Sequence, residues 1–545
     1  MPKIIQSKWF LVIAFLILVG PLALNFNFYY PDEVHYTDAA IQMLQNGDYL
    51  TPVQGSGEVR FNKPILTYWV VLLGYKLFGI SAFASRIFFF LSGALVFLLT
   101  FNIAKLIYSK QSTALLGTAI AVSNTAILMS SLRSIPDVLL CLFMTSSALG
   151  FAGFIKYGQR TPAKYNWILF VSLALAFEVK GVAALVLGFA GIAFLLLNPW
   201  QRIPLKKILH WPSIIVAILI AVLWFVVIFF RYGEAFTQSF YNDQIGERIS
   251  VKFGVILMNL GLSIVLILSL AIPWISFLTK ASFGRKQTKE QLAFRAFVIT
   301  WILTAVITSA LVFKFYERYL LPVIPLYSVW LGYLIVETVQ NRKNIHKLWN
   351  LIFSILHFMI LTIAILITIN FKASFIAYAW LILAIVLTVY IQINYLKSKS
   401  YLWLTISLLF VAFNLSIVTY KISFPDEGEQ ISEILKNTNI DPLKEIGMVG
   451  DLQIASKVRI ASKGTFHIVN IADLYAEYES ENYETLIVSE VQIKLFPAED
   501  FTIIGNSVSW NSSESKNLTL AILTGEYSQL LRLRGKKYYI LRRIS

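Results

Sequence analysis

Apolar runs long enough to cross a lipid bilayer recur along most of this 545-residue chain. A membrane-spanning helix needs roughly 20 consecutive apolar residues, because each residue advances the helix by only about 1.5 Å. The runs lie at residues 8–27, 85–107, 112–132, 136–155, 165–179, 181–198, 211–230, 253–279, 296–313, 319–337, 347–369, 375–395 and 401–420. They predict a mainly α, polytopic membrane protein with about 13 transmembrane helices.

The overall composition agrees with this prediction. Hydrophobic residues make up 57% of the chain and charged residues only 14%, whereas soluble domains are about 25% charged. The first run lacks a small-residue cleavage site and continues into charged residues, so we expect a retained first helix. The single cysteine, Cys141, lies inside an apolar run and excludes an intrachain disulfide.

The net positive charge of the chain comes from its apolar part, residues 1–420. The formal net charge is +16, but residues 421–545 hold 14 Lys and Arg against 17 Asp and Glu. Residues 1–420 hold the other 32 Lys and Arg against 13 acids. Because a nucleic-acid-binding domain carries its basic residues on one water-exposed surface, this distribution argues against a nucleic-acid partner.

The loop charges predict the orientation of the chain. With thirteen spans, the N-terminus and the loops on its side carry about 20 Lys and Arg and two acids, and basic loops stay cytoplasmic. We therefore expect a cytoplasmic N-terminus and an extracytoplasmic C-terminal region. The domains are then a transmembrane domain, 1–420, with an outer loop at 28–84, and an extracytoplasmic α/β domain, 421–545.

Local patterns indicate elements in both outer regions. In the first outer loop, 35–47 and 63–79 look like amphipathic or apolar helices that lie in the membrane interface. In the C-terminal region, helical patterns occupy 427–437 and 471–482. Strand patterns there occupy 445–451, 483–490, 501–506 and 536–543.

Two adjacent acids, Asp32 and Glu33, follow the first apolar run directly. Carboxylates at a membrane boundary are costly, which favours a functional role. The alternative is that both acids only cap the helix that follows them. Other charged residues also collect near the outer ends of the runs: Arg60, Lys63, Arg86, Arg133, Asp137, Glu178, Lys180, Arg231, Glu247, Arg248, Lys314 and Arg318. Snorkelling at the interface is the alternative for any single cation among them.

This mixture of side chains fits the transfer of a sugar from a lipid phosphate. A carboxylate can take the proton of an acceptor hydroxyl. Lysine and arginine, including Arg86, can hold a leaving phosphate. Aromatic residues such as Tyr68 can cover a sugar face.

The segments "YYPDEVHYTDAAIQML", "RFNKPILTYWVVLLGYKLFG" and "SAFASRIFFFLSGAL" resemble the polyprenyl-phosphate-dependent glycosyltransferases of the GT-C class. The likeness is to bacterial lipid A aminoarabinose transferases and to protein O-mannosyltransferases. It continues through "SLRSIPDVLLCLF", "LALAFEVKG", "LWFVVIFFRYGEAFTQSFYNDQIGERIS" and "FKFYERYLLPVIPLY", and covers about residues 8–335.

The resemblance implies a role for each matching position. Asp32 matches the catalytic carboxylate, Glu33 its support or a metal ligand, and Asp137 a second functional acid. Positions that match substrate-binding residues, most of them near the lipid phosphate, are Lys63, Arg248, Lys314 and Tyr319. A divalent cation held by Asp32, Glu33 and the substrate phosphate is an alternative, and no other cofactor is expected.

Four positions depart from the family pattern. His35 stands where arginine is usual, Ile65 where a second proline is usual, and Glu178 where an apolar residue is usual. The spacing from Lys314 to Tyr319 is one residue longer. These departures bear on the identity of the sugar rather than on the reaction class.

We therefore expect an inverting glycosyltransferase in a bacterial inner membrane. It would move a sugar from a polyprenyl-phosphate donor to an envelope acceptor, lipid A or another glycolipid, on the extracytoplasmic side. A protein acceptor is the first alternative. A transporter or flippase for lipid-linked solutes, and a polysaccharide ligase or polymerase, are the others. The partners implied are the donor lipid, the acceptor and membrane lipids.

Overall fold

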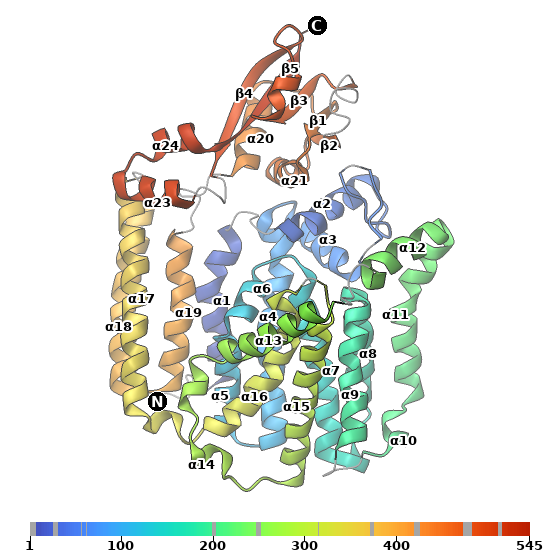
Figure 1. Ribbon diagram of the computed structural model, residues 1–545, viewed down its shortest axis with the longest axis vertical. Coiled ribbons are helices and arrows are strands. Elements are labelled where there is room, and N and C mark those ends of the chain that lie inside the picture. Colours follow the sequence, from blue (N-terminus) through green and yellow to red (C-terminus); the bar gives the residue numbers. More distant parts are fainter. Residues whose placement is uncertain are drawn as a thin grey trace.

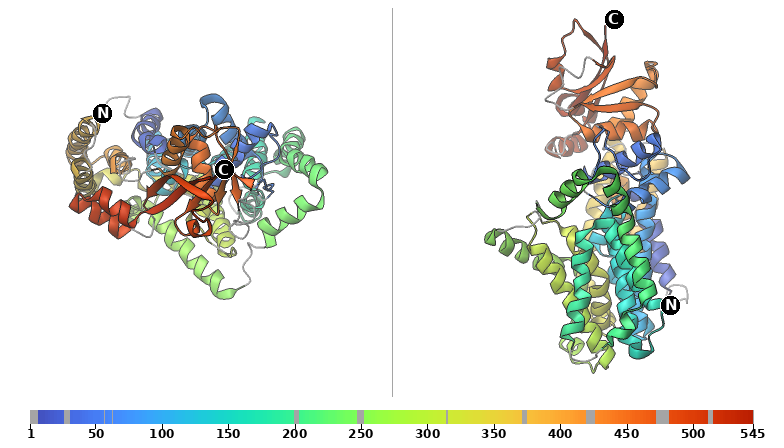
Figure 2. Two further views of the ribbon diagram at one scale, coloured as in Figure 1. Left: turned by 90° about the horizontal axis from the view of Figure 1, so that it is seen from above. Right: turned by 90° about the vertical axis from the view of Figure 1, so that its right-hand side faces the viewer.

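The computed structural model describes residues 7–25, 31–55, 57–61, 63–198, 203–246, 252–313, 315–370, 375–418, 426–471, 482–510 and 515–544. Long helices form one body, and a small sheet-containing domain lies at one end of it (Figure 1). Figure 2 (right) shows this C-terminal domain stacked beyond the end of the helical body where the first outer loop lies.

All thirteen predicted stretches coincide with helical structure. The helices are α1 Lys8–Asn25, α4 Ala82–Tyr108, α5 Gln111–Val122, α6 Thr125–Ser131, α7 Pro136–Tyr157, α8 Lys164–Lys180, α9 Val182–Leu197, α11 Trp211–Tyr232, α13 Phe253–Leu270, α15 Lys289–Ala310, α16 Ile324–Ile335, α17 Lys343–Asn370, α18 Phe375–Ser398 and α19 Tyr401–Val418. Shorter helical segments between them are η1 Gly158–Arg160, α10 Leu205–Ile208, α12 Glu234–Tyr241, η2 Asn242–Gly246, η3 Trp274–Phe277, α14 Lys280–Phe283, η4 Glu317–Val323 and η5 Val339–Asn341.

The mainly α, multi-span fold class is confirmed. Within the described part of the chain, eight helices are long and apolar enough to cross a membrane, and the bent pair α5 and α6 makes up to nine. The remaining predicted stretches form shorter helices, so the count of thirteen spans stays a prediction.

Two stretches that were predicted as continuous helices are interrupted. Between α5 and α6 the axis bends by 61°, because the Asn124 side chain accepts a hydrogen bond from the Ala126 amide (3.1 Å) and starts a new helix there. The stretch 253–279 breaks after α13, shortly before Pro273, whose ring and missing N–H do not fit a helix interior.

Small residues let neighbouring helices approach closely. Gly117 of α5 faces Gly332 of α16, and a Cβ built on Gly332 would lie 2.6 Å from the Gly117 backbone nitrogen. Such close packing is a common means of helix association inside membranes.

The first outer loop contains the two predicted helices, α2 Pro31–Asn46 and α3 Leu66–Phe78. Helix α2 starts at a proline, whose fixed φ and missing N–H suit the first helical position. The rings of Tyr36 and Tyr68 pack against each other across the two helices, with centroids 5.1 Å apart. Their position in a membrane interface stays a prediction.

The C-terminal domain is a five-stranded sheet with helices. Its strands are β1 Glu445–Val449, β2 His467–Ile471, β3 Thr485–Ser489, β4 Phe501–Ser509 and β5 Lys536–Arg543, in the order β2-β1-β3-β5-β4. Strand β1 is parallel to β2 and β3, and β5 is antiparallel to β3 and β4. The helices are α20 Glu427–Asn437, α21 Leu452–Ala461, α23 Ser515–Thr524 and α24 Tyr527–Arg534, with η8 Gln492–Leu495.

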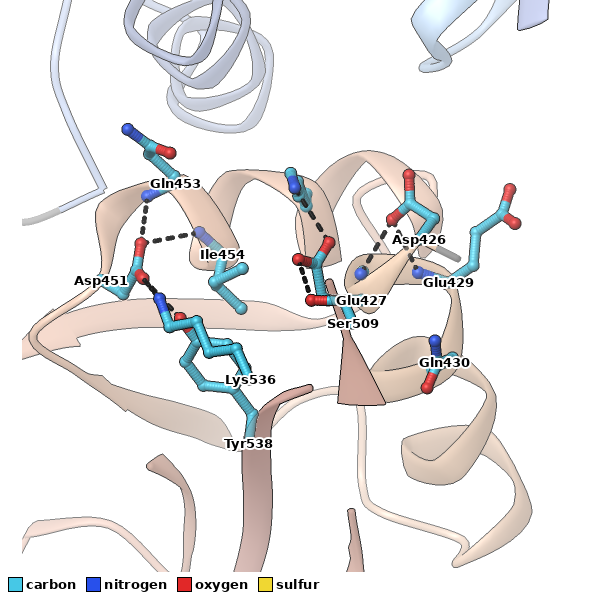
Figure 3. A network of polar contacts seen from close by, with 12 residues as sticks. Asp426, Glu427, Glu429, Gln430, Asp451, Gln453, Ile454, Ser509, Lys536 and Tyr538 are labelled. Carbon is cyan, nitrogen blue, oxygen red and sulfur yellow. Dashed lines mark hydrogen bonds and ion pairs between the residues drawn. The ribbon is translucent and has the colours of Figure 1, made fainter. Parts of the chain in front are cut away.

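The sequence predicted four of these strands and α20, which confirms the α/β character of the domain. It missed β2 and α21, and the helix predicted at 471–482 lies, apart from its ends, outside the described residues. Helix α21 is fixed to the sheet by its N-cap, Asp451 (Figure 3). This carboxylate also accepts hydrogen bonds from Tyr538 Oη (2.6 Å) and Lys536 Nζ (3.2 Å) of β5.

Candidate active site

A polar cavity of about 230 Å³ lies at the end of the helical body that carries the first outer loop. Six separate segments supply its walls: α2, the loop before α3, the start of α7, the end of α8, η2, and the segment around η4. The lining residues are Asp32, His35, Tyr36, Arg60, Lys63, Pro136, Asp137, Lys180, Asp243, Tyr316, Arg318 and Tyr319. Residues far apart in the sequence therefore converge on one small volume.

A chain of ion pairs joins the two predicted acids, Asp32 and Asp137. Arg318 Nη2 lies 2.8 Å from Asp32 Oδ2, and Arg318 Nε lies 3.7 Å from Asp137 Oδ2. Lys180 Nζ lies 2.5 Å from the other Asp137 oxygen. The Asp137 side chain is only 2% exposed, whereas that of Asp32 is 45% exposed. Asp137 therefore holds two cations in place, and Asp32 is the carboxylate that a substrate can reach.

Lys63 lines the cavity as the sequence predicted. Its ammonium lies 2.7 Å from Asp243 Oδ2. An anion that binds Lys63 would have to compete with this carboxylate. Asp243 had no predicted role, although it lies in the segment "YNDQIGERIS" that carries part of the family resemblance.

Glu33 faces away from the cavity. Its carboxylate accepts two hydrogen bonds from Arg86, from Nε (2.8 Å) and Nη2 (2.9 Å), and both side chains are 1% exposed. The Ser134 amide donates to the same carboxylate at 2.9 Å. Such a bidentate pair is strong and directional. It ties α2 to α4 and to the loop before α7, which favours an anchoring role for Glu33 and Arg86 over contact with substrate.

Of the two predicted aromatic residues, one lines the cavity and the other lies away from it. Tyr68 is fully buried beneath Tyr36 and does not line the cavity. Tyr319 lines it, and Lys180 Nζ lies 5.0 Å from the centre of the Tyr319 ring. Tyr36 lines it too, with the Arg60 guanidinium carbon 5.6 Å from its ring centre. Both contacts are cation–π interactions that orient the cations of the site.

Two predicted residues, Arg248 and Lys314, lie outside the described residues. Arg318 had been noted in the sequence only as an outer-face charge. It emerges as the cation between the two acids, and its guanidinium carbon lies 4.5 Å from the centre of the Tyr316 ring. The resemblance through "FKFYERYLLPVIPLY" was the signal that could have pointed to it.

His35 is a neutral member of the cavity wall. Its pKa is lowered to about 4, mainly by burial and also by the nearby Arg60 charge, while Asp32 acts in the opposite direction. Its buried Nδ1 has no hydrogen-bond partner among the residues that the structure describes. At neutral pH this side chain therefore adds a polar surface but no charge.

The geometry does not form a carboxylate pair for a metal ion. Asp32 and Glu33 point to different arginines, Arg318 and Arg86. Across the described ranges, no three His, Cys, Asp or Glu side chains gather in a group that could hold a metal.

The resemblance that the sequence predicted is confirmed by comparison with known proteins. A family model described as dolichyl-phosphate-mannose-protein mannosyltransferase matches residues 7–240. The fold matches the crystal structure of ArnT from Cupriavidus metallidurans in the apo state, with a TM-score of 0.70, 15% identity, and coverage of 98% of this chain and 97% of that one. ArnT bound to undecaprenyl phosphate gives a TM-score of 0.69 at 15% identity, over 91% of this chain and 95% of that one.

More particular likenesses come from curated relatives. An uncharacterized protein of Aquifex aeolicus is 31% identical over 241 residues, which is 44% of this chain and 47% of that protein. An undecaprenyl phosphate-alpha-4-amino-4-deoxy-L-arabinose arabinosyl transferase of Serratia proteamaculans is 24% identical over 327 residues, 59% of this chain and 58% of the enzyme. The chain therefore spans about half of the length of the curated relatives it matches.

Proposed function

We propose that this protein is an integral-membrane glycosyltransferase. Its donor is a polyprenyl-phosphate sugar, and its acceptor is an envelope molecule, lipid A or another glycolipid, on the extracytoplasmic side of a bacterial inner membrane. The observation that carries the proposal is the cavity beside the outer loop, where an accessible carboxylate, Asp32, lies among the cations Lys63, Arg60 and Arg318. The relatives that act on undecaprenyl-phosphate sugars support the choice of donor.

The proposed reaction is a single displacement. The acceptor hydroxyl attacks the anomeric carbon, its proton passes to Asp32, and the bond from that carbon to the phosphate oxygen breaks. The electron pair of the broken bond leaves with the polyprenyl phosphate. Because the acceptor attacks from the side opposite the departing phosphate, the anomeric carbon is inverted. If the acceptor is itself a phosphate, it needs little base assistance. Asp32 then positions the sugar and stabilises the positive charge that develops at its ring.

The cations of the cavity divide the remaining work. Lys63 and Arg60 lie on the outer-loop side and stabilise the departing phosphate. Arg318 holds Asp32 in place through its ion pair, and Asp137 with Lys180 fixes Arg318 in turn. Because these charges are already arranged before the substrate binds, little reorganisation is needed during the reaction.

A second candidate is transfer to a protein acceptor. The observation in its favour is the match of the protein mannosyltransferase model to residues 7–240. The donor chemistry and the roles of Asp32 and Lys63 are the same in both cases, so the difference lies in the acceptor alone.

A transfer assay tests the proposal. Purified protein in detergent is incubated with polyprenyl-phosphate donors that carry radiolabelled sugars, together with lipid A, other envelope glycolipids or serine- and threonine-rich peptides. We expect label to move to a lipid acceptor with release of polyprenyl phosphate. Label on the peptides selects the second candidate. An intact donor that only changes membrane leaflet in proteoliposomes contradicts transfer and indicates a transporter.

A further inference from the structure

The C-terminal domain contacts the acid-bearing helix α2 through a buried ion pair. Arg459 of α21 donates from Nη1 to Asp38 of α2, and both side chains are 1% exposed. The other Asp38 oxygen accepts a hydrogen bond from the Gly55 amide at 2.8 Å. Arg459 also donates from Nε and Nη2 to the Ile468 carbonyl of β2, at 3.1 and 2.6 Å. One guanidinium therefore joins the C-terminal sheet to the first outer loop.

Further contacts lie along the same boundary between the C-terminal domain and the first outer loop. The Gln45 side chain at the end of α2 donates to the Gly464 carbonyl at 3.2 Å. The Asn470 amide of β2 donates to the Gly55 carbonyl at 3.3 Å. A side chain at Gly55 would collide with the Arg459 guanidinium, so this guanidinium packs directly against the glycine.

The residues at this boundary belong to two segments that also line the cavity. Asp38 is on the same helix as Asp32, His35 and Tyr36. Gly55 lies in a loop that folds back on itself, with hydrogen bonds from the Gln54 amide to the Glu58 carbonyl (2.9 Å) and from the Arg60 amide to the Pro52 carbonyl (2.7 Å). The Arg459–Asp38–Gly55 contact thus fixes α2 and the Arg60 loop relative to each other.

A buried ion pair adds little net stability if its only role is to attach the C-terminal domain to the outer loop. Taking two charges out of water is expensive, and apolar residues of the same volume often stabilise as well or better. The pair does, however, specify one relative position of the partners, because a shift leaves a charge buried without its counter-ion. A positioning role therefore explains why this ion pair lies between the C-terminal domain and the cavity.

We propose that the C-terminal domain sets the geometry of the cavity, with Arg459 as a positioning residue that acts through Asp38. This inference rests on the proposed function for its kinetic test but not for its structural one. Misplacement of a catalytic group by about 1 Å can lower turnover by about 10²-fold, so loss of the pair is expected to reduce kcat without removal of any group that touches substrate.

The test compares four variants. Arg459→Met and Asp38→Asn break the pair, and Arg459→Lys keeps the charge. Lys457→Met is the matched control, because Lys457 is on the same helix and its ion pair with Glu427 (2.9 Å) stays inside the C-terminal domain. We expect kcat to fall about 10²-fold in the two pair-breaking variants, to recover partly in Arg459→Lys, and to remain at the wild-type value in Lys457→Met.

A second measurement reports position without turnover. His35→Cys places a thiol on the cavity wall, and the native Cys141 is buried. The rate at which a charged thiol reagent labels His35→Cys is measured in each background, with the chain that retains His35 as the blank. We expect faster labelling when Arg459→Met or Asp38→Asn is added, and no change with Lys457→Met.

Several results would overturn the inference. Wild-type kcat in Asp38→Asn does so, and so does a labelling rate of His35→Cys that the added Asp38→Asn leaves unchanged. An equal loss of kcat in Lys457→Met also does so, because it indicates only a need for a folded domain. If Arg459→Met does not fold, the isosteric Asp38→Asn decides alone. If the wild-type protein transfers no sugar from any donor, the proposed function fails, and the labelling rates still decide on the positioning.

Discussion

At the scale of single residues, the two adjacent acids have opposite environments. Asp32 is 45% exposed in the cavity, whereas Glu33 is 1% exposed and held by Arg86. We predict that Asp32→Asn lowers transfer by at least about 10²-fold, the lower end of general acid–base contributions, and leaves the melting temperature unchanged. Asparagine caps a helix about as well as aspartate, so a pure capping role leaves this variant fully active.

Glu33→Gln is the paired variant. It leaves the Arg86 guanidinium buried without its counter-charge, and breaking a buried pair costs about 3–5 kcal/mol. We therefore expect a clear fall in melting temperature and some remaining transfer. An unchanged melting temperature together with complete loss of transfer would indicate a direct catalytic role for Glu33 instead of an anchoring one. For each variant, the melting curve and the transfer assay are measured on the same preparation.

Lys63 gives a second prediction at this scale. Lys63→Ala is expected to lower kcat about 10²-fold or more, because a preorganised cation at the leaving phosphate is lost, and Lys63→Arg is expected to retain part of the activity. The control is Lys76→Ala, an exposed lysine on α3 whose ammonium lies 3.9 Å from the centre of the Tyr49 ring. Equal kinetics in Lys63→Ala and the control would remove Lys63 from the site.

His35 predicts a pH dependence of stability. Its pKa falls from 6.5 to about 4 on folding, so between these values the unfolded chain binds a proton that the folded chain excludes. The contribution of the neutral His35 side chain to folding stability is complete above pH 6.5 and is lost as the pH falls toward 4. We expect the melting temperature of His35→Gln to fall less steeply over this window than that of the wild type. His467→Gln, at an exposed position of β2, is the control, and parallel slopes in all three proteins contradict the assignment.

At the scale of elements, local patterns predicted most of the molecule. The apolar runs predicted the long helices, and the patterns at 427–437 and 536–543 matched α20 and β5. The breaks did not follow from the patterns, because apolar residues continue on both sides of Asn124 and before Pro273. Strand β2 was missed because its five residues mix His467 and Asn470 with apolar ones.

The bend at Asn124 provides a prediction for one element. Its side chain caps α6 and also donates to the Leu270 carbonyl at the end of α13 (3.0 Å). We predict that Asn124→Ala destabilises the protein by about 1–2 kcal/mol, as the loss of an N-cap does, seen as a lower melting temperature. Asn394→Ala, which removes an exposed bond within α18, is the control and is expected to have a much smaller effect.

The site was only partly predictable, for reasons of distance along the chain. The acids and Lys63 stand out locally, because they lie next to apolar runs. Their partners do not: Arg318 comes from a segment almost three hundred residues after Asp32, and Arg459 is 421 residues from Asp38. Which cation meets which acid depends on tertiary packing, and a single sequence carries no direct record of it.

At the scale of the whole molecule, the charge distribution predicts the orientation. We expect the outer loop and the C-terminal domain to lie on the same, extracytoplasmic side, because the opposite loops hold the basic excess. The contact between Asp38 and Arg459 requires the same side for both regions. A reporter that is active only in the cytoplasm, fused after Ser545, should be inactive, and the same reporter at the N-terminus should be active. Activity at Ser545 would contradict the orientation.

The charges that line the cavity carry a consequence for the catalytic cycle. Among the described residues, its walls hold four cations, Arg60, Lys63, Lys180 and Arg318, and three carboxylates, Asp32, Asp137 and Asp243. The surplus of one positive charge matches the single negative charge of a phosphodiester donor. The polyprenyl phosphate that remains after transfer is a monoester with about −1.5 to −2 charges at pH 7. Under the proposed function, the site is therefore expected to bind the spent lipid more firmly than the donor.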